Sequence, residues 1–330
     1  MRIRLAILAV AVTLLLASVQ AQTITIYVGR GEALAGPIIE RFEAATGIDV
    51  AVRYGSTAEL AGLIIEEGSA SPADAFWAQD AGALGALERA GRLVQVPADL
   101  TANVPAKNTH PSGMWVAVSA RNRVLVYSTD RVDAAALPAS IFDFVDEQYN
   151  GRVAWAPGNA SFQSFVTALR VTYGEDAARE WLEGMIANGT KSYSNNGSQL
   201  DAIAAGEVDF GLVNNYYLLR RLATEPTFPV GQTFFDDGDI GNLANVTGIG
   251  VVAGTDQAEL VHQFIAFLLS DEAQTFFTDD NQEYPITSTV APNAALAPLG
   301  DPVAASPLVD LASIDDLQGT LELLTEVGLL

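Results

Sequence analysis

Hydrophobic and polar residues follow two different periods in the first hundred residues of the chain. Residues 23–28 alternate between polar and apolar side chains, as a half-buried strand does. Leu34, Ile38 and Phe42 then recur at helical spacing, and Gly47 marks the end of that helix. The same succession follows twice more, with strands expected at residues 50–54 and 75–78 and helices at residues 57–65 and 81–90. This order of strands and helices predicts a parallel sheet with helices on both faces.

The rest of the chain has the same mixture of elements without a visible boundary between two halves. Residues 116–127 favour a strand, and Arg121-Asn122-Arg123 is expected to interrupt it. No linker rich in proline, glycine or serine appears, so two lobes joined by strands that cross more than once would explain the pattern. Further strands are expected at residues 152–155, 210–213 and 247–253, and further helices at residues 162–173, 177–187, 216–223, 256–269 and 313–327.

The first 21 residues have the pattern of a secretory signal peptide. Arg2 and Arg4 precede an apolar run at residues 5–17, and Val19-Gln20-Ala21 resembles a cleavage site. Cleavage there leaves 309 of the 330 residues, which suits two lobes at roughly 150 residues per domain. Because cysteine is absent, no lipid-modified cysteine can follow cleavage, and we expect a protein free in the periplasm or secreted. An uncleaved membrane anchor is the alternative.

The charge balance narrows the classes of function. Asp and Glu number 40 against 17 Lys and Arg, which gives a net charge of −23. Nucleic acid is therefore not an expected partner, because this surface would repel its phosphates. The absence of cysteine excludes zinc-finger, iron–sulfur and cysteine-nucleophile chemistry, and a hydrophobic content of 49% disfavours a disordered acidic chain.

Three loops combine small polar residues with the start of an expected helix. They are Asn159-Ala160-Ser161, Asn195-Asn196-Gly197-Ser198 and Asn214-Asn215-Tyr216-Tyr217. In α/β sheets ligands bind beyond the carboxyl ends of strands, and the free N–H groups of a helix N-terminus suit anions. Paired tyrosines add hard oxygen donors, which at neutral pH lose their protons only to a strongly charged cation such as Fe³⁺. The alternative is that Tyr216 and Tyr217 are packing residues.

The tyrosine loop resembles the tandem-tyrosine motif of bacterial periplasmic ferric-ion-binding proteins, which serve iron-uptake ABC transporters. Other segments are similar to the same family, namely Ile24-Thr25-Ile26-Tyr27, the arginine-containing strand at residues 121–127, and Glu283-Tyr284-Pro285. The resemblance covers nearly all of the chain after residue 21. It implies a periplasmic-binding-protein clamshell of two α/β lobes, each a mainly parallel sheet flanked by helices, joined by crossing hinge strands. The implied divisions are residues 22–121 and 247–297 for lobe 1, 122–246 for lobe 2, and 298–330 for a C-terminal helical segment on lobe 2.

The resemblance also implies what the cleft between the lobes contains. Tyr216 and Tyr217 would bind ferric ion together with a synergistic carbonate or phosphate, without covalent chemistry. The implied contacts to the anion are Asn159, Ala160, Ser161, Asn196 and Asn214. An ABC permease in the inner membrane is the implied partner, and we expect a monomer.

The first lobe departs from the family's best-known pattern of ligands. Gly31 stands where some members have a histidine ligand, Gln79 stands where they have a glutamate, and Phe162 replaces a tyrosine used in other branches. The residues considered as further ligands are Tyr54, Asp80, Tyr27 and Gln79. Asp80 is also expected to cap the helix that follows it.

Three arginines are candidates for holding the anion through paired hydrogen bonds: Arg30, Arg121 and Arg123. For Arg121 and Arg123, an ion pair that bridges the lobes is the alternative.

Other solutes on the same scaffold are the competing hypotheses. Thiamine would need an aromatic side chain in the cleft, but Trp77, inside a strand pattern, is expected in the core. A polyamine would need several carboxylates there, and Asp80 is the one carboxylate that the sequence suggests. A phosphonate is the third candidate. A secreted acid/base hydrolase is a remote alternative, because 40 acidic residues make chance pairs common. We therefore expect a binding protein and not an enzyme.

Overall fold

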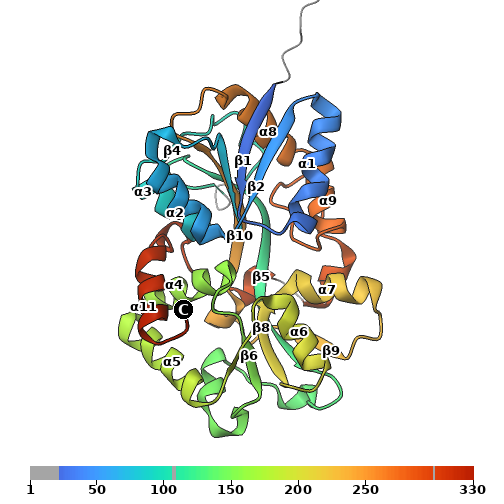
Figure 1. Ribbon diagram of the computed structural model, residues 1–330. Coiled ribbons are helices and arrows are strands. Elements are labelled where there is room, and N and C mark those ends of the chain that lie inside the picture. Colours follow the sequence, from blue (N-terminus) through green and yellow to red (C-terminus); the bar gives the residue numbers. More distant parts are fainter. Residues whose placement is uncertain (1–21, 106–108, 300–301) are drawn as a thin grey trace, which may run out of the picture.

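Two lobes make up the computed structural model, which describes residues 22–105, 109–299 and 302–330 (Figure 1). The lobes lie one above the other, and strands β5 (Val116–Ser128) and β10 (Ala244–Val252) run through the junction between them. This arrangement confirms the predicted two-lobed α/β architecture. The expected signal peptide at residues 1–21 lies outside the described residues. Within the described ranges, no helix combines the length and the apolar character needed to cross a membrane.

The first lobe is built on the strands that begin the chain. β1 (Thr23–Val28) pairs in parallel with β2 and β3 on its two sides, and β10 joins β3 in the antiparallel direction. Ile24, Ile26 and Val28 share one face of β1 and are fully buried, and Tyr27 on the other face is 1% exposed, because helices cover both faces of this sheet. The other elements of the lobe are β2 (Asp49–Tyr54), β3 (Ala75–Ala78), β4 (Leu93–Val94), α1 (Glu32–Thr46), α2 (Thr57–Glu67), α3 (Ala81–Arg89), α8 (Ala258–Leu268) and α9 (Asp271–Asp279).

The second lobe repeats this plan on a smaller sheet. β6 (Val153–Trp155) pairs in parallel with β7 and β8, whereas β5 runs antiparallel to β8 and β9. Its other elements are β7 (Lys191–Ser192), β8 (Phe210–Asn214), β9 (Val230–Thr233), α4 (Ala160–Tyr173), α5 (Glu175–Ala187), α6 (Asn196–Ala204) and α7 (Asn215–Thr224). The strand order through both lobes is β2-β1-β3-β10-β5-β8-β6-β7, with β4 beside β10 and β9 beside β5.

The strand β5 is continuous through Arg121-Asn122-Arg123, so the expected interruption is wrong. Asn122 is paired with Ala244 of β10, and the next residue, Arg123, is paired with Asn214 of β8. The polar triplet is therefore the point at which the strand passes from one lobe's sheet to the other. Its arginines tolerate burial because they are paired with acceptors, which the sequence pattern alone does not reveal.

Of the two helix signals named from the sequence, Gly47 operates as predicted and Asp80 does not. Gly47 adopts the left-handed conformation (φ 73°) that ends α1, and the Oγ of Ser56 accepts a hydrogen bond from Glu59 N–H at 3.2 Å at the start of α2. Asp80 occupies the corresponding position before α3, but its carboxylate makes no capping hydrogen bond. It pairs instead with Arg121, because a charged donor is a stronger partner than a backbone amide.

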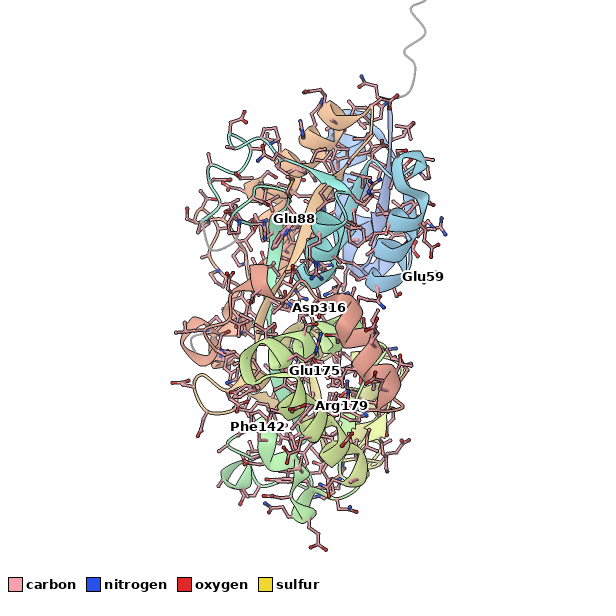
Figure 2. All side chains as sticks on the ribbon, turned by 90° about the vertical axis from the view of Figure 1, so that its left-hand side faces the viewer. Glu59, Glu88, Phe142, Glu175, Arg179 and Asp316 are labelled. Carbon is pink, nitrogen blue, oxygen red and sulfur yellow. The ribbon has the colours of Figure 1, made fainter. Side chains whose placement is uncertain are left out.

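The C-terminal segment contacts both lobes. Asp316 pairs with Arg170 of α4 at 2.9 Å, and Asp315 pairs with Arg89 of α3 at 3.3 Å. In Figure 2, Asp316 lies accordingly at the level where the two lobes meet. The helices of this segment are α10 (Pro302–Ala305) and α11 (Leu317–Glu326).

Candidate metal centre

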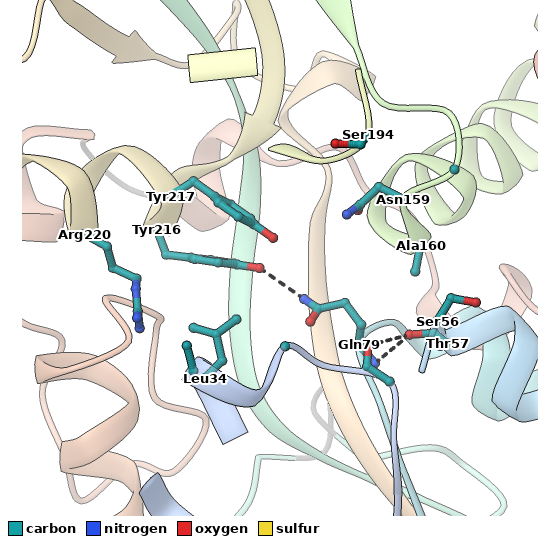
Figure 3. A pocket seen from close by; sticks show the side chains of 14 residues that line it. Leu34, Ser56, Thr57, Gln79, Asn159, Ala160, Ser194, Tyr216, Tyr217 and Arg220 are labelled. Carbon is teal, nitrogen blue, oxygen red and sulfur yellow. Dashed lines mark hydrogen bonds between the residues drawn. The ribbon is translucent and has the colours of Figure 1, made fainter. Parts of the chain in front are cut away.

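A cleft of about 380 Å³ opens between the lobes and is lined by residues from both (Figure 3). These residues lie just beyond the carboxyl ends of β1, β2 and β3 in the first lobe and of β6, β7 and β8 in the second. The cleft thus occupies the place where α/β sheets bind ligands. The polar lining side chains are Ser56, Thr57, Gln79, Asn159, Ser194, Tyr216, Tyr217 and Arg220.

The paired tyrosines lie in the first turn of α7, directly after β8. Their rings are stacked, with centroids 4.5 Å apart and planes inclined by 26°. Both hydroxyls point in the same direction, toward the space between Gln79 and Asn159 (Figure 3). Two adjacent phenol oxygens that share one cleft can bind a single cation together.

Burial raises the pKa of Tyr216 well above the ordinary phenol value, and the nearby Tyr217 and Glu283 raise it further. Arg30 and Arg121 lower this pKa, but their effect is the smaller one. Tyr216 is 1% exposed, so water does little to stabilise a phenolate there. The phenol therefore keeps its proton at neutral pH unless a strongly charged cation replaces that proton.

Gln79 is the one candidate ligand of the first lobe that reaches the tyrosines. Its Nε2 donates a hydrogen bond to the Oη of Tyr216 at 3.3 Å, across the cleft (Figure 3). The backbone N–H of Gln79 donates to the hydroxyl of Thr57 at 3.4 Å, which helps to hold the residue at the end of β3. The amide therefore faces Tyr216 as a donor, whereas a metal ligand would offer its oxygen.

The other candidates of the first lobe do not line the cleft. Asp80 is buried against Arg121, so its carboxylate already has a cationic partner. The hydroxyl of Tyr27 donates to Glu67 at 3.1 Å, and Tyr54 is 36% exposed at the end of β2. Among the described residues, no group of three or more His, Cys, Asp or Glu side chains could hold a metal ion. Oxygen donors of the tyrosine pair are thus the strongest metal-binding feature of the cleft.

Among the anion candidates of the second lobe, Asn159 and Asn196 both contact the hydroxyl of Ser161. Ser161 Oγ donates to Asn159 Oδ1 at 2.6 Å and accepts from Asn196 Nδ2 at 3.4 Å and Arg123 Nη1 at 3.5 Å. Asn159 caps α4, and Ala160, the first residue of that helix, lines the cleft. The Nδ2 of Asn214 is buried and has no acceptor among the described residues. Together, these asparagine side chains and the first backbone N–H groups of α4 are the donors that an anion bound at the start of α4 would need.

The three candidate arginines lie behind the cleft, and each contacts at least one protein group. Four of their guanidinium nitrogens have no hydrogen-bond partner among the described residues, namely Arg30 Nε, Arg121 Nε, Arg121 Nη1 and Arg123 Nε. Arg30 Nη2 pairs with Glu283 Oε1 at 2.7 Å, and Arg121 pairs with Asp80. Arg123 donates to the carbonyl of Leu212 at 2.9 Å and forms no ion pair among the described residues. Burial lowers its pKa to about 10 although the nearby Asp80 raises it, which leaves Arg123 charged at neutral pH. We call these three arginines and two carboxylates the hinge cluster. It retains one more positive than negative charge.

Replacing Arg121 with methionine is expected to destabilise the protein by about 3–5 kcal/mol, because Asp80 then remains as a buried carboxylate without its partner. Urea unfolding followed by circular dichroism measures this loss. Arg41→Met, which breaks the exposed pair with Asp280, is the control and should change stability far less. If both variants lost the same free energy of unfolding, the buried Asp80–Arg121 pair would stabilise the protein no more than the exposed Arg41–Asp280 pair does.

Some lining residues were not foreseen from the sequence. Arg220 lies one helical turn after Tyr216 on α7, a spacing that does predict a shared face. Its Nη1 donates to Asn281 Oδ1 at 2.8 Å. Ser194 follows the two-residue strand β7, and Thr57 is the first residue of α2; neither was expected at the site from the sequence. Only the fold shows that their loops meet.

Comparisons with known proteins agree with this architecture. The family model described as bacterial extracellular solute-binding protein matches residues 70–304. The Fe(3+)-binding periplasmic protein of Serratia marcescens is 33% identical over 94% of this chain and 91% of its own length. The major ferric iron-binding protein of Neisseria meningitidis serogroup B is 32% identical over 99% of this chain and 98% of its own. Iron-bound HitA from Pseudomonas aeruginosa superposes with a TM-score of 0.88 at 32% identity, over 93% of this chain and 99% of its own. The chain belongs to the family of bacterial extracellular solute-binding proteins.

Proposed function

We propose that this protein captures ferric ion with a synergistic anion in the cleft between its lobes and delivers the ion to an ABC permease in the inner membrane. The observation that carries the proposal is the pair of stacked tyrosines, Tyr216 and Tyr217, with both hydroxyls in one cleft. The names of the relatives from Serratia marcescens and Neisseria meningitidis, both of which refer to ferric iron, support the choice of ion.

Ferric ion suits this donor set better than a divalent metal does. A phenol ordinarily loses its proton only near pH 10, so a high cationic charge is needed to displace two such protons at neutral pH. Two phenolates leave one positive charge on Fe³⁺, which a bound anion can neutralise. Zn²⁺ in proteins prefers thiolate, imidazole and carboxylate donors, none of which lines the described part of the cleft.

The synergistic anion belongs at the start of α4. Asn159 and Ala160 line the cleft there. Ser161 lies behind them, with its N–H and hydroxyl donating to Asn159 Oδ1 and its hydroxyl accepting from Asn196 Nδ2, and the buried Nδ2 of Asn214 has no acceptor among the described residues. Carbonate and phosphate are the small anions that such a group can hold. Arg30, Arg121 and Arg123 contribute positive potential from behind rather than direct contacts, since their guanidinium groups are buried and do not line the cleft.

Capture and delivery require the protein to be exported. Residues 1–21 would direct it to the periplasm, where it acts as a monomer that a permease recognises in the closed form. Tighter contacts in the closed state are what shift the open–closed equilibrium on binding. Hydrogen bonds across the cleft, such as that from Gln79 to Tyr216, are contacts of this kind.

The competing solutes find less support in the cleft. Trp77 is fully buried in the core, as expected, and offers no stacking surface to thiamine. No carboxylate lines the described part of the cleft, which disfavours both a polyamine and a hydrolase that uses an acid pair. A phosphonate would fit the anion-binding group but would leave the tyrosine pair without a role.

Visible absorption spectroscopy tests the proposal. We expect the purified protein, titrated with ferric ion from a weak chelate in carbonate buffer, to develop a tyrosinate charge-transfer band that saturates at about one iron per chain. Mg²⁺ and Zn²⁺, which give no such band, are the control titrations. Absence of the band in both carbonate and phosphate buffers would contradict a ferric site.

Replacing Gln79 with leucine is expected to weaken ferric binding by about 1.5–3 kcal/mol, because a hydrogen bond to a charged phenolate is lost. The charge-transfer band should also shift, since its energy depends on the electron density at the phenolate oxygen. Competition with a chelator measures the affinity, and the band position reports the hydrogen bond. Gln95→Leu removes an amide outside the cleft and should leave both unchanged. A normal band position in Gln79→Leu would exclude this contact to Tyr216 in the loaded protein.

A further inference from the structure

A second cavity, of about 620 Å³, lies on the other side of the hinge strands β5 and β10 from the cleft. Ala120 and Asn122 of β5 line it, together with residues 244–246 of β10. The residues that follow them on β5, Arg121 and Arg123, belong instead to the hinge cluster behind the tyrosines. Because successive residues of a strand point to opposite faces, the cavity and the cleft lie on opposite sides of the strand. No described residue lines both, and we call the second space the hinge cavity.

The walls of the hinge cavity belong to different lobes. The first-lobe wall includes Pro292, whose neighbour Asn293 donates its backbone N–H to a threonine hydroxyl of α9 at 2.7 Å. The second-lobe wall includes Ser306, whose neighbour Ala305 accepts a hydrogen bond from Asn242 Nδ2 at 3.1 Å. The width of the cavity therefore depends on the angle between the lobes.

The lining of the hinge cavity is mostly apolar. Four of its residues are prolines, which have no backbone N–H, and most of the others are alanine, valine or leucine. Leu308 is fully exposed at the rim, so its side chain meets water until a ligand covers it. Asp310 is the one charged residue of the described lining, and it would repel an anion. Sites for small organic molecules have this composition and a volume of roughly 300–1,000 Å³.

We propose that the hinge cavity is a second binding site, which takes a small, uncharged and mainly apolar molecule, and that its occupation favours the closed cleft. In this structure the lobes are in contact across the cleft, through Gln79 and Tyr216. The hinge strands lie between the cleft and the cavity. A rotation that separates the lobes at the cleft therefore brings them together behind the strands and narrows the cavity.

A molecule that fits the cavity at its present width accordingly binds the closed arrangement more tightly than the open one. Only the effect on metal binding rests on the proposed function, since the cavity itself lies outside the cleft. If the closed form holds ferric ion more tightly, each ligand must raise the affinity for the other by the same factor.

Nile red, an uncharged dye that fluoresces in apolar surroundings, is the probe for the site. We expect the metal-free protein to bind about one dye per chain, and Ala244→Phe, which fills the cavity from β10, to bind it at least about tenfold more weakly. Leu308→Asp changes a fully exposed residue, so it leaves the fold intact and should also weaken binding by placing a charge at the rim. Ala51→Phe is the matched control, because Ala51 is exposed on β2 outside the cavity. Equal dye binding by all of these variants would overturn the site.

Gallium(III), which has the charge of ferric ion but gives no colour, tests the coupling in carbonate buffer. Loading with gallium should lower the Kd of the dye about fivefold or more. An unchanged Kd in protein that retains gallium on a desalting column would overturn the coupling. Failure to retain gallium would instead contradict the proposed function and leave the cavity site standing. Sedimentation of the protein as a dimer that Leu308→Asp dissociates would show that a second copy covers the cavity, and would overturn a small-molecule site.

Discussion

Replacing Tyr216 or Tyr217 with phenylalanine should lower the affinity for ferric ion at least about a hundredfold and remove most of the tyrosinate band. Each substitution deletes one of the two anionic donors in the described lining and leaves the aromatic ring in place. Because the rings stack at 4.5 Å and Tyr216 is buried, phenylalanine keeps the packing and only the oxygen is lost. Affinity measured by competition with a chelator, together with the band intensity, gives the result.

Tyr173→Phe is the matched control, since that tyrosine is exposed on the second lobe and far from the lining. It should bind iron as the unchanged protein does. Thermal unfolding without metal should be nearly the same in all three variants, which separates a lost ligand from a damaged fold. Normal iron affinity in both cleft variants would exclude the tyrosine pair as the metal ligand and with it the proposed function.

The tyrosine pair could be found from the sequence because its signal is local. Adjacent tyrosines after a buried strand and at the start of a helix keep that position in the structure. The repeated strand–helix order was equally informative: β1, β3 and the end of α1 at Gly47 lie where the periodicity predicted them. Local hydrophobic patterns define such elements because burial of one face is what stabilises them.

The partners of the pair could not be found in this way because they depend on distant contacts. Gln79 and Asp80 are consecutive, yet Gln79 reaches the cleft whereas Asp80 joins the hinge cluster. Successive residues of an extended chain point to opposite sides, and only the position of β5 decides which side holds the cation. For the same reason, the sequence predicted that Arg121-Asn122-Arg123 interrupts the strand, because the distant partner of Arg121 was not known. In the structure Arg121 pairs with Asp80, and the strand is buried and continuous.

The contacts between the lobes suggest how binding and closure are linked. Gln79 of the first lobe donates to Tyr216 of the second, and Arg220 next to the tyrosines donates to Asn281 at the end of α9. A cation that converts Tyr216 to a phenolate strengthens the first of these hydrogen bonds, because a charged acceptor binds a donor more tightly than a neutral one. Under the proposed function, metal binding would thus favour the arrangement in which the lobes are close, which is the differential affinity that a population shift requires.

The same chemistry predicts a steep dependence of iron affinity on pH. Burial raises the pKa of Tyr216, and a phenol ordinarily holds its proton up to about pH 10, so capture of ferric ion must release one proton from each tyrosine. The sign follows directly: protons compete with the metal, and acid drives its release. With two protons per ion, the affinity should fall about a hundredfold for each unit of pH below neutrality.

Competition with a chelator of known protonation behaviour measures this slope, after correction for the protons that the chelator itself takes up. The unchanged protein should give a slope near two protons per iron, and Tyr217→Phe should give a slope near one. Tyr27→Phe is the control, because the hydroxyl of Tyr27 binds Glu67 outside the cleft and should leave the slope unchanged. A slope near zero in the unchanged protein would mean that the ion is held by groups already deprotonated at neutral pH. Since the described lining contains no carboxylate, such a result would place the ion outside this cleft and contradict its capture by the tyrosines.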